Sequence, residues 1–395
     1  MTAANPTRER TTARAAKRPR WSRRNPFPAT VLENTLLTAP DSEREVRHLV
    51  LDIDGSGLEY EPGDAVNVTP ANEPALVAAI VDRLGVPGDT VIADRKGERT
   101  LTNALIHGFE ITSVSPYLLD HLATARGVRE VAELLAGDKA DLEQWSRGRD
   151  VLDLLNLDAT WHPTPEAFLS ELRPLTARTY SISSSPSVHR GTLHLTPATV
   201  RHRARDDWGD GRDRGGAAST YLADRVEAGD TVGIYLTPNK SFHLPEPDTD
   251  IIMVGPGTGI APFRAFVHER AQDDGNGRNW LFHGARRRDL DFLYSDEMTV
   301  LHADGAIDRL DVAFSREQEE KVYVSDLLGS HAEEIYSWLR DGAVLYVCGN
   351  ADRMARDVDE ALTTIIKDQA GLDDESARAE MERLRAAGQY RRDVY

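Results

Sequence analysis

The chain has 395 residues and a net charge of −18, and this length allows two or three domains with a sizeable core. It has no apolar run of about 18 residues and no apolar segment near the N-terminus, so neither a membrane span nor a secretory signal is expected. One cysteine excludes an intramolecular disulfide and favours a cytoplasmic location, and the 12 histidines show no metal-ligand spacing, so no metal site is expected.

Charge is unevenly distributed along the chain. Residues 1–30 hold eight Lys and Arg and one acidic residue, whereas the remainder has a net charge of −25. An acidic body repels nucleic acid, so no nucleic-acid partner is expected. Residues 1–24 lack periodicity and predict a basic disordered tail. Docking of this tail to an acidic partner, an acidic membrane surface or RNA is the alternative.

The first structured part is expected to begin at Asn25. Alternating apolar residues predict a strand at 46–53, followed by a glycine-containing turn at 54–57. Residues 61–68 predict a further turn that leads into another strand. From about 73 to 172 the periodicity becomes helical. The clearest helical segments are residues 74–84, 120–135 and 151–157.

The strand with the clearest chemistry is Arg-Thr-Tyr-Ser-Ile-Ser-Ser-Ser at 178–185. Arg178 can hold a diphosphate through paired hydrogen bonds. Tyr180 can lie against an aromatic ring, and Ser181 can hydrogen-bond a ring heteroatom. An exposed strand with a structural tyrosine is the alternative.

Another strand is expected at 191–196, and residues 216–222 predict the start of a helix. Free amide groups at a helix start favour a phosphate group. An ordinary capped helix start is the alternative.

The second half of the chain predicts a doubly wound parallel sheet, because strands and helices alternate regularly. The expected strands are residues 250–255, 279–285, 310–315 and 344–348, and the expected helices are residues 263–271, 326–339 and 353–366.

Two stretches of this half predict a phosphorylated nucleotide. Gly-Pro-Gly-Thr-Gly at 255–259 joins a buried strand to a helix, where small residues admit a diphosphate. Ser315 and Arg316 end a strand, and Lys321 and Tyr323 follow. Two cations, a hydroxyl and a phenol suit a dianionic phosphate beside an adenine ring. A solvated charged loop is the alternative.

These motifs, in this order, resemble the diflavin branch of the ferredoxin-NADP reductase superfamily, and within it the flavoprotein component of NADPH sulfite reductase. The resemblance runs from about Asn25 to Tyr395. It implies FAD and NADPH as cofactors. It also implies an antiparallel FAD-binding β-barrel with a helical insert, followed by a parallel-sheet NADP-binding domain. The expected boundaries are 1–24 for the tail, 25–247 for the barrel with its insert at about 73–172, and 248–395 for the NADPH domain.

The resemblance assigns residues to both cofactors. For FAD it implies Thr112, Arg147, Arg178, Thr179, Tyr180, Ser181, Thr196, Pro197, Ala198, His202, Gly216, Ala217, Ala218, Ser219 and Tyr395. For NADPH it implies Arg47, Gly255, Gly257, Thr258, Gly259, Ser315, Arg316, Lys321, Val322, Tyr323, Val324, Ser325 and Asp357. His202, Pro197 and Ala198 differ from the residues usual at these family positions. A surface role is the alternative for Arg47.

The resemblance also implies a catalytic group. Cys348, within Tyr-Val-Cys-Gly, would lie beside the reacting nicotinamide carbon. A small buried hydrophobic residue is the alternative for it. Asp393 and Ser181 would join it, and Tyr395 would stack over the flavin.

The implied function is an NADPH-dependent FAD reductase of an assimilatory sulfite reductase. Family members usually carry an FMN domain upstream, for which the segment before Asn25 is too short. The expected partner is therefore a separate acceptor protein, such as the haem and iron–sulfur subunit of sulfite reductase, and no membrane partner is expected. Alternative acceptors are a ferredoxin, a flavodoxin or a nitrate or nitrite reductase. A non-catalytic scaffold subunit is a further alternative.

Overall fold

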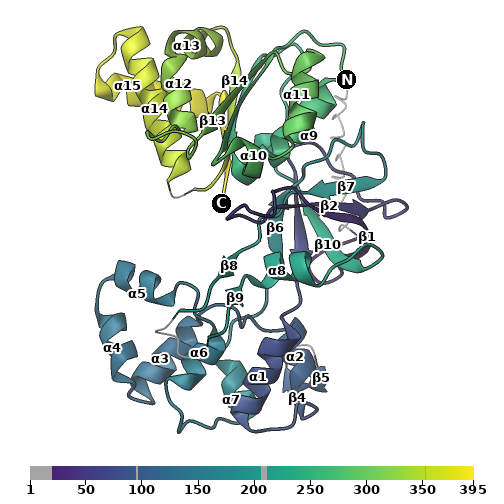
Figure 1. Cartoon of the computed structure of the whole chain (residues 1–395), viewed down its shortest axis with the longest axis vertical. Helices are drawn as coiled ribbons and strands as arrows, with labels where there is room; N and C mark the ends of the chain where they lie inside the picture. Colours follow the sequence, from purple (N-terminus) through teal and green to yellow (C-terminus); the bar gives the residue numbers. More distant parts are fainter. Residues whose placement is uncertain (1–19, 95–96, 206–210, 352) are drawn as a thin grey trace, which may run out of the picture.

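The computed structural model describes residues 20–94, 97–205, 211–351 and 353–395. Figure 1 shows three parts: a parallel sheet between helices, a barrel beside it, and a helical lobe at the far end of the barrel. No helix among the described residues is long and apolar enough to cross a membrane.

Within the described residues, a six-stranded antiparallel sheet forms the barrel, in the order β6-β3-β10-β1-β2-β7. A bridge between Ile182 and Leu195 joins the two outer strands of this order and closes the barrel. Alternating side chains such as Leu49, Leu51 and Val66 fill its interior. The strands are β1 (Phe27–Leu36), β2 (Arg47–Asp52), β3 (Ala65–Thr69), β6 (Arg178–Ser181), β7 (Thr192–Leu195) and β10 (Thr231–Thr237).

The helical lobe is inserted between β3 and β6 and has a core of its own. Its two ends are tied together at the barrel, because Asn72 donates to the Phe109 carbonyl at 2.7 Å and Glu110 N donates to the Arg173 carbonyl at 2.8 Å. Its elements are α1 (Pro74–Leu84), β4 (Val91–Asp94), β5 (Gly97–Thr100), α2 (Leu101–His107), α3 (Pro116–Thr124), α4 (Arg129–Ala136), α5 (Lys139–Ser146), α6 (Val151–Asn156) and α7 (Pro165–Ser170).

Short elements connect the lobe, the barrel and the second sheet. Asp150 and Asp153 form a capping box at the start of α6 and also bind Arg212 and Arg214, which brings residues 212–214 against the lobe. These connecting elements are β8 (Arg201–His202), β9 (Arg214–Gly215), α8 (Ala217–Asp224) and the 3₁₀ turn η2 (Lys240–Phe242).

The second sheet is parallel throughout its described strands, in the order β13-β12-β11-β14-β15. Ile252 and Val254 face helices α12–α15, whereas Ile251 and Met253 face α9 and α11. The elements are β11 (Ile251–Pro256), η3 (Gly257–Ile260), α9 (Ala261–Arg270), β12 (Asn279–Ala285), α10 (Arg288–Asp291), α11 (Ser295–Ala303), β13 (Arg309–Phe314), α12 (Val324–Ser330), α13 (Ala332–Arg340), β14 (Val344–Gly349), α14 (Met354–Ala370), α15 (Asp374–Ala386) and β15 (Tyr390–Val394).

The barrel and the parallel sheet share a packed junction. Val46 and Phe242 enter the core beneath α9 and α11. His48 Nδ1 lies 2.9 Å from the Tyr294 hydroxyl, and Arg264 donates to the Ser183 carbonyl at 2.7 Å. This junction fixes the carboxyl ends of the parallel strands against the barrel, where the site described next is found.

The expected fold class is confirmed, and several local details differ. The helix expected at 120–135 is two helices separated at Gly127, whose φ of 66° is left-handed. The hairpin β4–β5, helix α15 and strand β15 had no counterpart among the expected elements. Of the expected disordered tail, residues 1–19 lie outside the described residues. Trp21, near its end, donates to the Ser56 carbonyl at 2.8 Å.

Candidate functional site

A small polar cluster lies where the barrel meets the parallel sheet. Ser181 ends β6, and Cys348 on β14 stands opposite Asp393 on β15. The Ser181 hydroxyl donates to Asp393 Oδ2 at 2.7 Å, and Cys348 Sγ lies 4.0 Å from the same oxygen. The structure therefore brings together three of the expected catalytic residues from segments far apart in the chain.

Burial controls the charge of this cluster. It raises the pKa of the Cys348 thiol well above its usual range, and the nearby Asp393 raises it further. Burial also raises the pKa of Asp393, although the hydrogen bond from Ser181 opposes this. The thiol is therefore neutral, and Asp393 can hold a proton more readily than an exposed aspartate.

Tyr395 connects this cluster to the glycine loop. Its hydroxyl lies 2.9 Å from Thr258 Oγ1, and its backbone N donates to the Gly349 carbonyl at 3.0 Å. The residue is 61 % exposed, so its ring is open to a ligand. Asn239, which had not been predicted, lies 3.5 Å from the other Asp393 oxygen through Nδ2.

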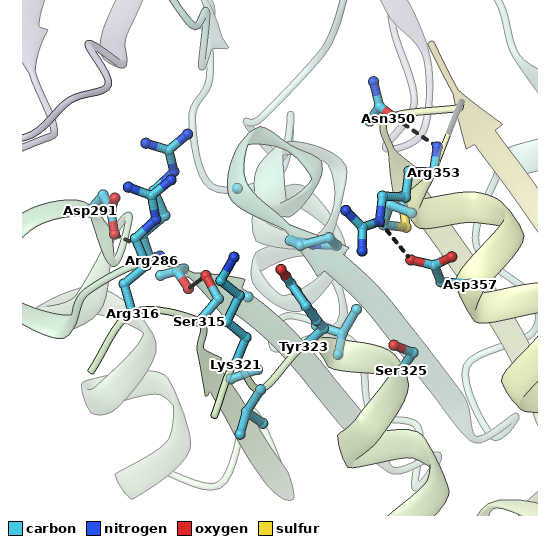
Figure 2. Close-up of a pocket in the computed structure, with 18 of the residues that line it drawn as sticks. Arg286, Asp291, Ser315, Arg316, Lys321, Tyr323, Ser325, Asn350, Arg353 and Asp357 are labelled. Carbon is cyan, nitrogen blue, oxygen red and sulfur yellow. Dashed lines mark hydrogen bonds and ion pairs between the residues drawn. The ribbon is translucent and has the colours of Figure 1, made fainter. Parts of the chain in front are cut away.

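A pocket of about 450 Å³ opens at the carboxyl ends of the parallel strands. It brings together most residues expected to contact the nucleotide, several of which are labelled in Figure 2. The expected residues that line it are Gly257, Thr258, Ser315, Arg316, Lys321, Val322, Tyr323, Val324, Ser325 and Asp357. This is the place where open parallel sheets generally bind ligands.

Three residues expected to contact the nucleotide do not line the pocket: Arg47, Gly255 and Gly259. Arg47 donates to Asn34 Oδ1 at 2.9 Å, and it does not line the pocket. A Cβ added at Gly259 would lie 2.1 Å from the Cys348 carbonyl oxygen, and one at Gly255 would lie 2.5 Å from the Gly259 oxygen. Gly259 thus lets the loop pack against β14, and Gly255 lets the loop fold back closely over the end of β11.

The pocket also contains cations that the sequence had not singled out. Arg44, Arg286 and Arg353 all line it. Partial burial lowers the pKa of the Arg44 guanidinium, and the positive charges of Arg286 and Arg316 lower it further. A pocket with this excess of positive charge suits a ligand carrying several phosphate groups. The sequence signal was the Arg286-Arg-Arg288 run directly after the β12 strand.

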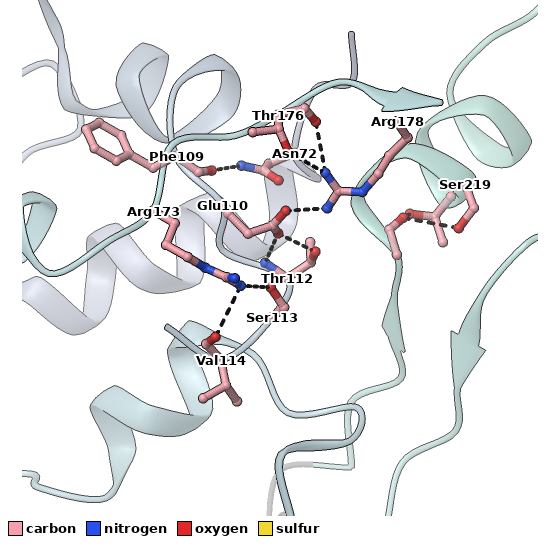
Figure 3. A network of polar contacts seen from close by, with 12 residues as sticks. Asn72, Phe109, Glu110, Thr112, Ser113, Val114, Arg173, Thr176, Arg178 and Ser219 are labelled. Atoms are coloured by element: carbon pink, nitrogen blue, oxygen red, sulfur yellow. Dashed lines mark hydrogen bonds and ion pairs between the residues drawn. The ribbon is translucent and has the colours of Figure 1, made fainter. Parts of the chain in front are cut away.

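The residues expected at the diphosphate of a flavin lie around β6 and the lobe. Arg178 is bound by Glu110 Oε2 at 2.6 Å and donates to the Thr176 carbonyl at 2.9 Å, as Figure 3 shows. The other Glu110 oxygen accepts from Thr112, at 3.0 Å from N and 2.7 Å from Oγ1. The Glu110 side chain is only 5 % exposed. Thr112 therefore lies in the same network as Arg178.

The neighbouring positions on β6 have distinct surroundings. Thr179 Oγ1 donates to Asn67 Oδ1 at 2.9 Å, which fixes it to β3. Tyr180 packs against the barrel core, and burial raises the pKa of its phenol to about 12. The phenol is therefore neutral and its ring presents an apolar surface.

The remaining expected flavin contacts occupy the connecting segments. Burial and the nearby Arg147 lower the pKa of His202, so the imidazole is neutral. Thr196 bonds the Tyr294 hydroxyl at 2.7 Å, the Pro197 carbonyl accepts from Arg47 N, and Ala198 bridges to Val46.

Helix α8 begins immediately after Gly216, without a side-chain cap. Ala217, Ala218 and Ser219 form its first turn and are buried, and Ser219 Oγ accepts from Val200 N at 3.1 Å. The amide groups of a helix's first turn have no acceptor within the helix, so they suit a phosphate.

A closed antiparallel barrel followed by a doubly wound sheet, with sites suited to phosphate groups in both, defines a two-domain flavin- and nucleotide-binding class of protein. The chain belongs to the FAD-binding domain family, which matches residues 19–221. The oxidoreductase NAD-binding domain family matches residues 253–360.

Curated relatives match nearly the whole chain. The sulfite reductase [NADPH] flavoprotein alpha-component of Aliivibrio fischeri is 42 % identical over 96 % of this chain. Those of Bacillus subtilis and Escherichia coli K12 are 41 % and 40 % identical over 95 % of it. The chain spans 62 % of the length of each of these relatives.

Proposed function

We propose that this chain transfers electrons from NADPH to a bound FAD and then to a separate acceptor protein, as the flavoprotein component of a sulfite reductase in the cytoplasm. Residues 25–247 would bind FAD and residues 248–395 would bind NADPH. The observation that carries the proposal is the cluster of Ser181, Cys348 and Asp393 at the junction of the two parts. The relatives are named alpha-components, which supports a second polypeptide as the acceptor.

The residues of the barrel fit FAD. Arg178 and the first-turn amides of α8 would hold the diphosphate, Tyr180 and Tyr395 would contact the ring system, and Ser181 would hydrogen-bond a ring heteroatom. Figure 3 shows Arg178 with its partners and Ser219, from the first turn of α8, in one view. FAD, when bound, supplies the conversion between two-electron and one-electron transfer.

The residues of the pocket fit NADPH rather than NADH. Arg316, Lys321 and Ser315 would bind the 2′-phosphate, and Tyr323 would lie against adenine. The Tyr323 residue is 39 % exposed, which leaves its ring available. Thr258 lines the same pocket and bonds Tyr395, so the nucleotide would run from the pocket toward the polar cluster.

The cluster would orient the nicotinamide end of the substrate. Asp393 accepts the hydrogen bond from the Ser181 hydroxyl at Oδ2 and so holds it in place. Burial raises the pKa of Asp393, so this carboxyl group takes up a proton more readily than an exposed one. The neutral Cys348 thiol would place a polarisable, uncharged sulfur atom beside the nicotinamide. The exposed Tyr395 would move aside to admit the nicotinamide.

The test is an anaerobic titration of the flavin-loaded protein with NADPH and, separately, NADH, followed by flavin absorbance. NADPH is expected to bleach the flavin, and NADH hardly at all. Replacing Asp393→Asn is expected to slow bleaching about tenfold or more by disturbing the cluster that orients the nicotinamide, while NADP⁺ binding stays within about twofold because the pocket is intact. A colourless protein that takes up no FAD, or a flavin that neither nucleotide reduces, would contradict the proposal and favour the scaffold alternative.

A further inference from the structure

A carboxylate from the barrel part bridges two of the arginines that line the nucleotide pocket. Glu43 lies in the connection between β1 and β2. Its Oε2 atom lies 2.5 Å from Arg286 Nη1 and 2.8 Å from Arg316 Nη1. One carboxylate oxygen therefore bridges two guanidinium groups.

The two arginines are neighbours because of the parallel sheet. Arg286 follows β12 and Arg316 follows β13, and Arg316 N donates to the Arg286 carbonyl at 2.9 Å. Figure 2 shows the two side chains together, with Ser315 and Lys321 next to them. A phosphate monoester carries up to two negative charges and three acceptor oxygens, so it matches this group better than one carboxylate does.

The bridge is exposed and therefore easily replaced. The side chain of Glu43 is 67 % exposed, and those of Arg316 and Arg286 are 43 % and 27 % exposed. Exposed ion pairs contribute little to stability. The connection that carries Glu43 is held elsewhere, because Ala39 N donates to the Leu290 carbonyl at 2.8 Å. The Glu43 side chain can thus turn away while Arg44 stays at the pocket.

Resting on the proposed function, we infer that Glu43 stands in the place of the 2′-phosphate and that NADPH must displace it. Glu43 thereby lowers the affinity for 2′-phosphorylated nucleotides and speeds the release of NADP⁺. It leaves the binding of nucleotides without a 2′-phosphate unchanged, because these do not compete with it.

The test is calorimetric titration of the flavin-loaded protein with adenosine 2′,5′-bisphosphate and with 5′-AMP, which differ only in the 2′-phosphate. Glu43→Gln is expected to tighten binding of the bisphosphate about three- to tenfold, since two exposed ion pairs no longer oppose it. Binding of 5′-AMP is expected to stay within about twofold. Glu45→Gln is the matched control. It removes the same charge from the same connection, and Glu45 pairs with Arg201 and Arg47 outside the pocket.

Each other outcome has a definite meaning. Weaker bisphosphate binding in Glu43→Gln would overturn the inference and show that Glu43 organises the arginines instead. Equal tightening in both variants, or of both nucleotides, would overturn it in favour of a general charge effect. Wild-type protein that binds both nucleotides equally would contradict the proposed NADPH site itself, which separates that failure from failure of the inference.

Discussion

The molecule has two regions whose arginines suit a phosphate group, the flavin region around β6 and the nucleotide pocket of the parallel sheet. Carboxylates hold the arginines differently in these two regions. Arg178, in the flavin region, is bound by Glu110, whose side chain is 5 % exposed and which also binds Thr112. Arg286 and Arg316, in the nucleotide pocket, are bridged by Glu43, whose side chain is 67 % exposed.

This difference matches the different duties proposed for the two regions. A buried carboxylate with both oxygens occupied cannot leave without a large penalty, so Glu110 fixes Arg178 permanently in one orientation. An exposed carboxylate on a neighbouring segment can leave at little cost. A retained cofactor benefits from the first arrangement, and a nucleotide that enters and leaves in every cycle benefits from the second.

The largest effect is expected from Arg178→Ala. It removes the cation for the diphosphate and leaves one oxygen of the buried Glu110 without its arginine, so we expect FAD affinity to fall about a hundredfold. The measurement is the flavin content after dialysis against known FAD concentrations. Arg173→Ala is the control, because Arg173 belongs to the same network through Ser113 at 3.0 Å and is exposed. Unchanged FAD retention in Arg178→Ala would show that the arginine serves the barrel alone.

A smaller effect is expected from Arg316→Ala in the exchangeable region. Losing one charge-assisted contact should weaken NADPH binding about tenfold, and NADH binding should stay within about twofold. Kd values from quenching of protein fluorescence would report both. Arg287→Ala removes a neighbouring exposed charge that does not line the pocket, and should change neither value. An equal loss of affinity for NADPH and NADH would show that Arg316 does not bind the 2′-phosphate.

The smallest effect concerns the junction between the two regions. Burial first, and then the charge of Arg264, lower the pKa of His48 from 6.5 to about 4, with Glu33 and Glu297 opposing this. The folded state therefore binds fewer protons than the unfolded state between about pH 4 and 6.5, so stability is full above pH 6.5 and falls as the pH drops toward 4. The expected loss is about 1.4 kcal/mol per pH unit for each such histidine.

Urea unfolding at several pH values would measure this dependence. His48→Gln should reduce the pH dependence by the contribution of one histidine, because burial also lowers the pKa of His189, His194 and His283. His162→Gln, at an exposed position in the lobe, should leave it unchanged. An identical pH dependence in wild type and His48→Gln would show that the junction does not depend on a neutral imidazole at this position.

Much of the fold could be predicted from the sequence because the signals were local. The strand at 279–285 and the helix at 74–84 were both found in this way. The single expected helix at 120–135 was wrong in detail, because apolar periodicity continues across Gly127 while the backbone turns there.

The sequence predicted those residues of the candidate site that belong to a recognisable motif. Ser181, Cys348 and Asp393 were expected together and do meet. Glu43 and Arg286 could not be found, since their pairing joins residues 243 positions apart and depends on the packing of the barrel against the sheet. Arg44 and Arg47 are both cations near the start of β2, and only the path of the chain shows which one lines the pocket.

The insertion of the helical lobe between β3 and β6 has a consequence for the order of folding. These two strands pair directly, with Ala65 opposite Ser181, although more than a hundred residues separate them. Bringing distant segments together costs entropy that grows with the length of the intervening chain. In the folded lobe, Asn72 bonds Phe109 and the next residue, Glu110, bonds Arg173. These contacts hold the two ends of the lobe close together. A lobe that folds first around its own core would therefore shorten the effective loop between β3 and β6. The barrel would then close only after the lobe has folded. Mutations in the core of the lobe would therefore delay flavin uptake, although they change no residue that contacts the flavin.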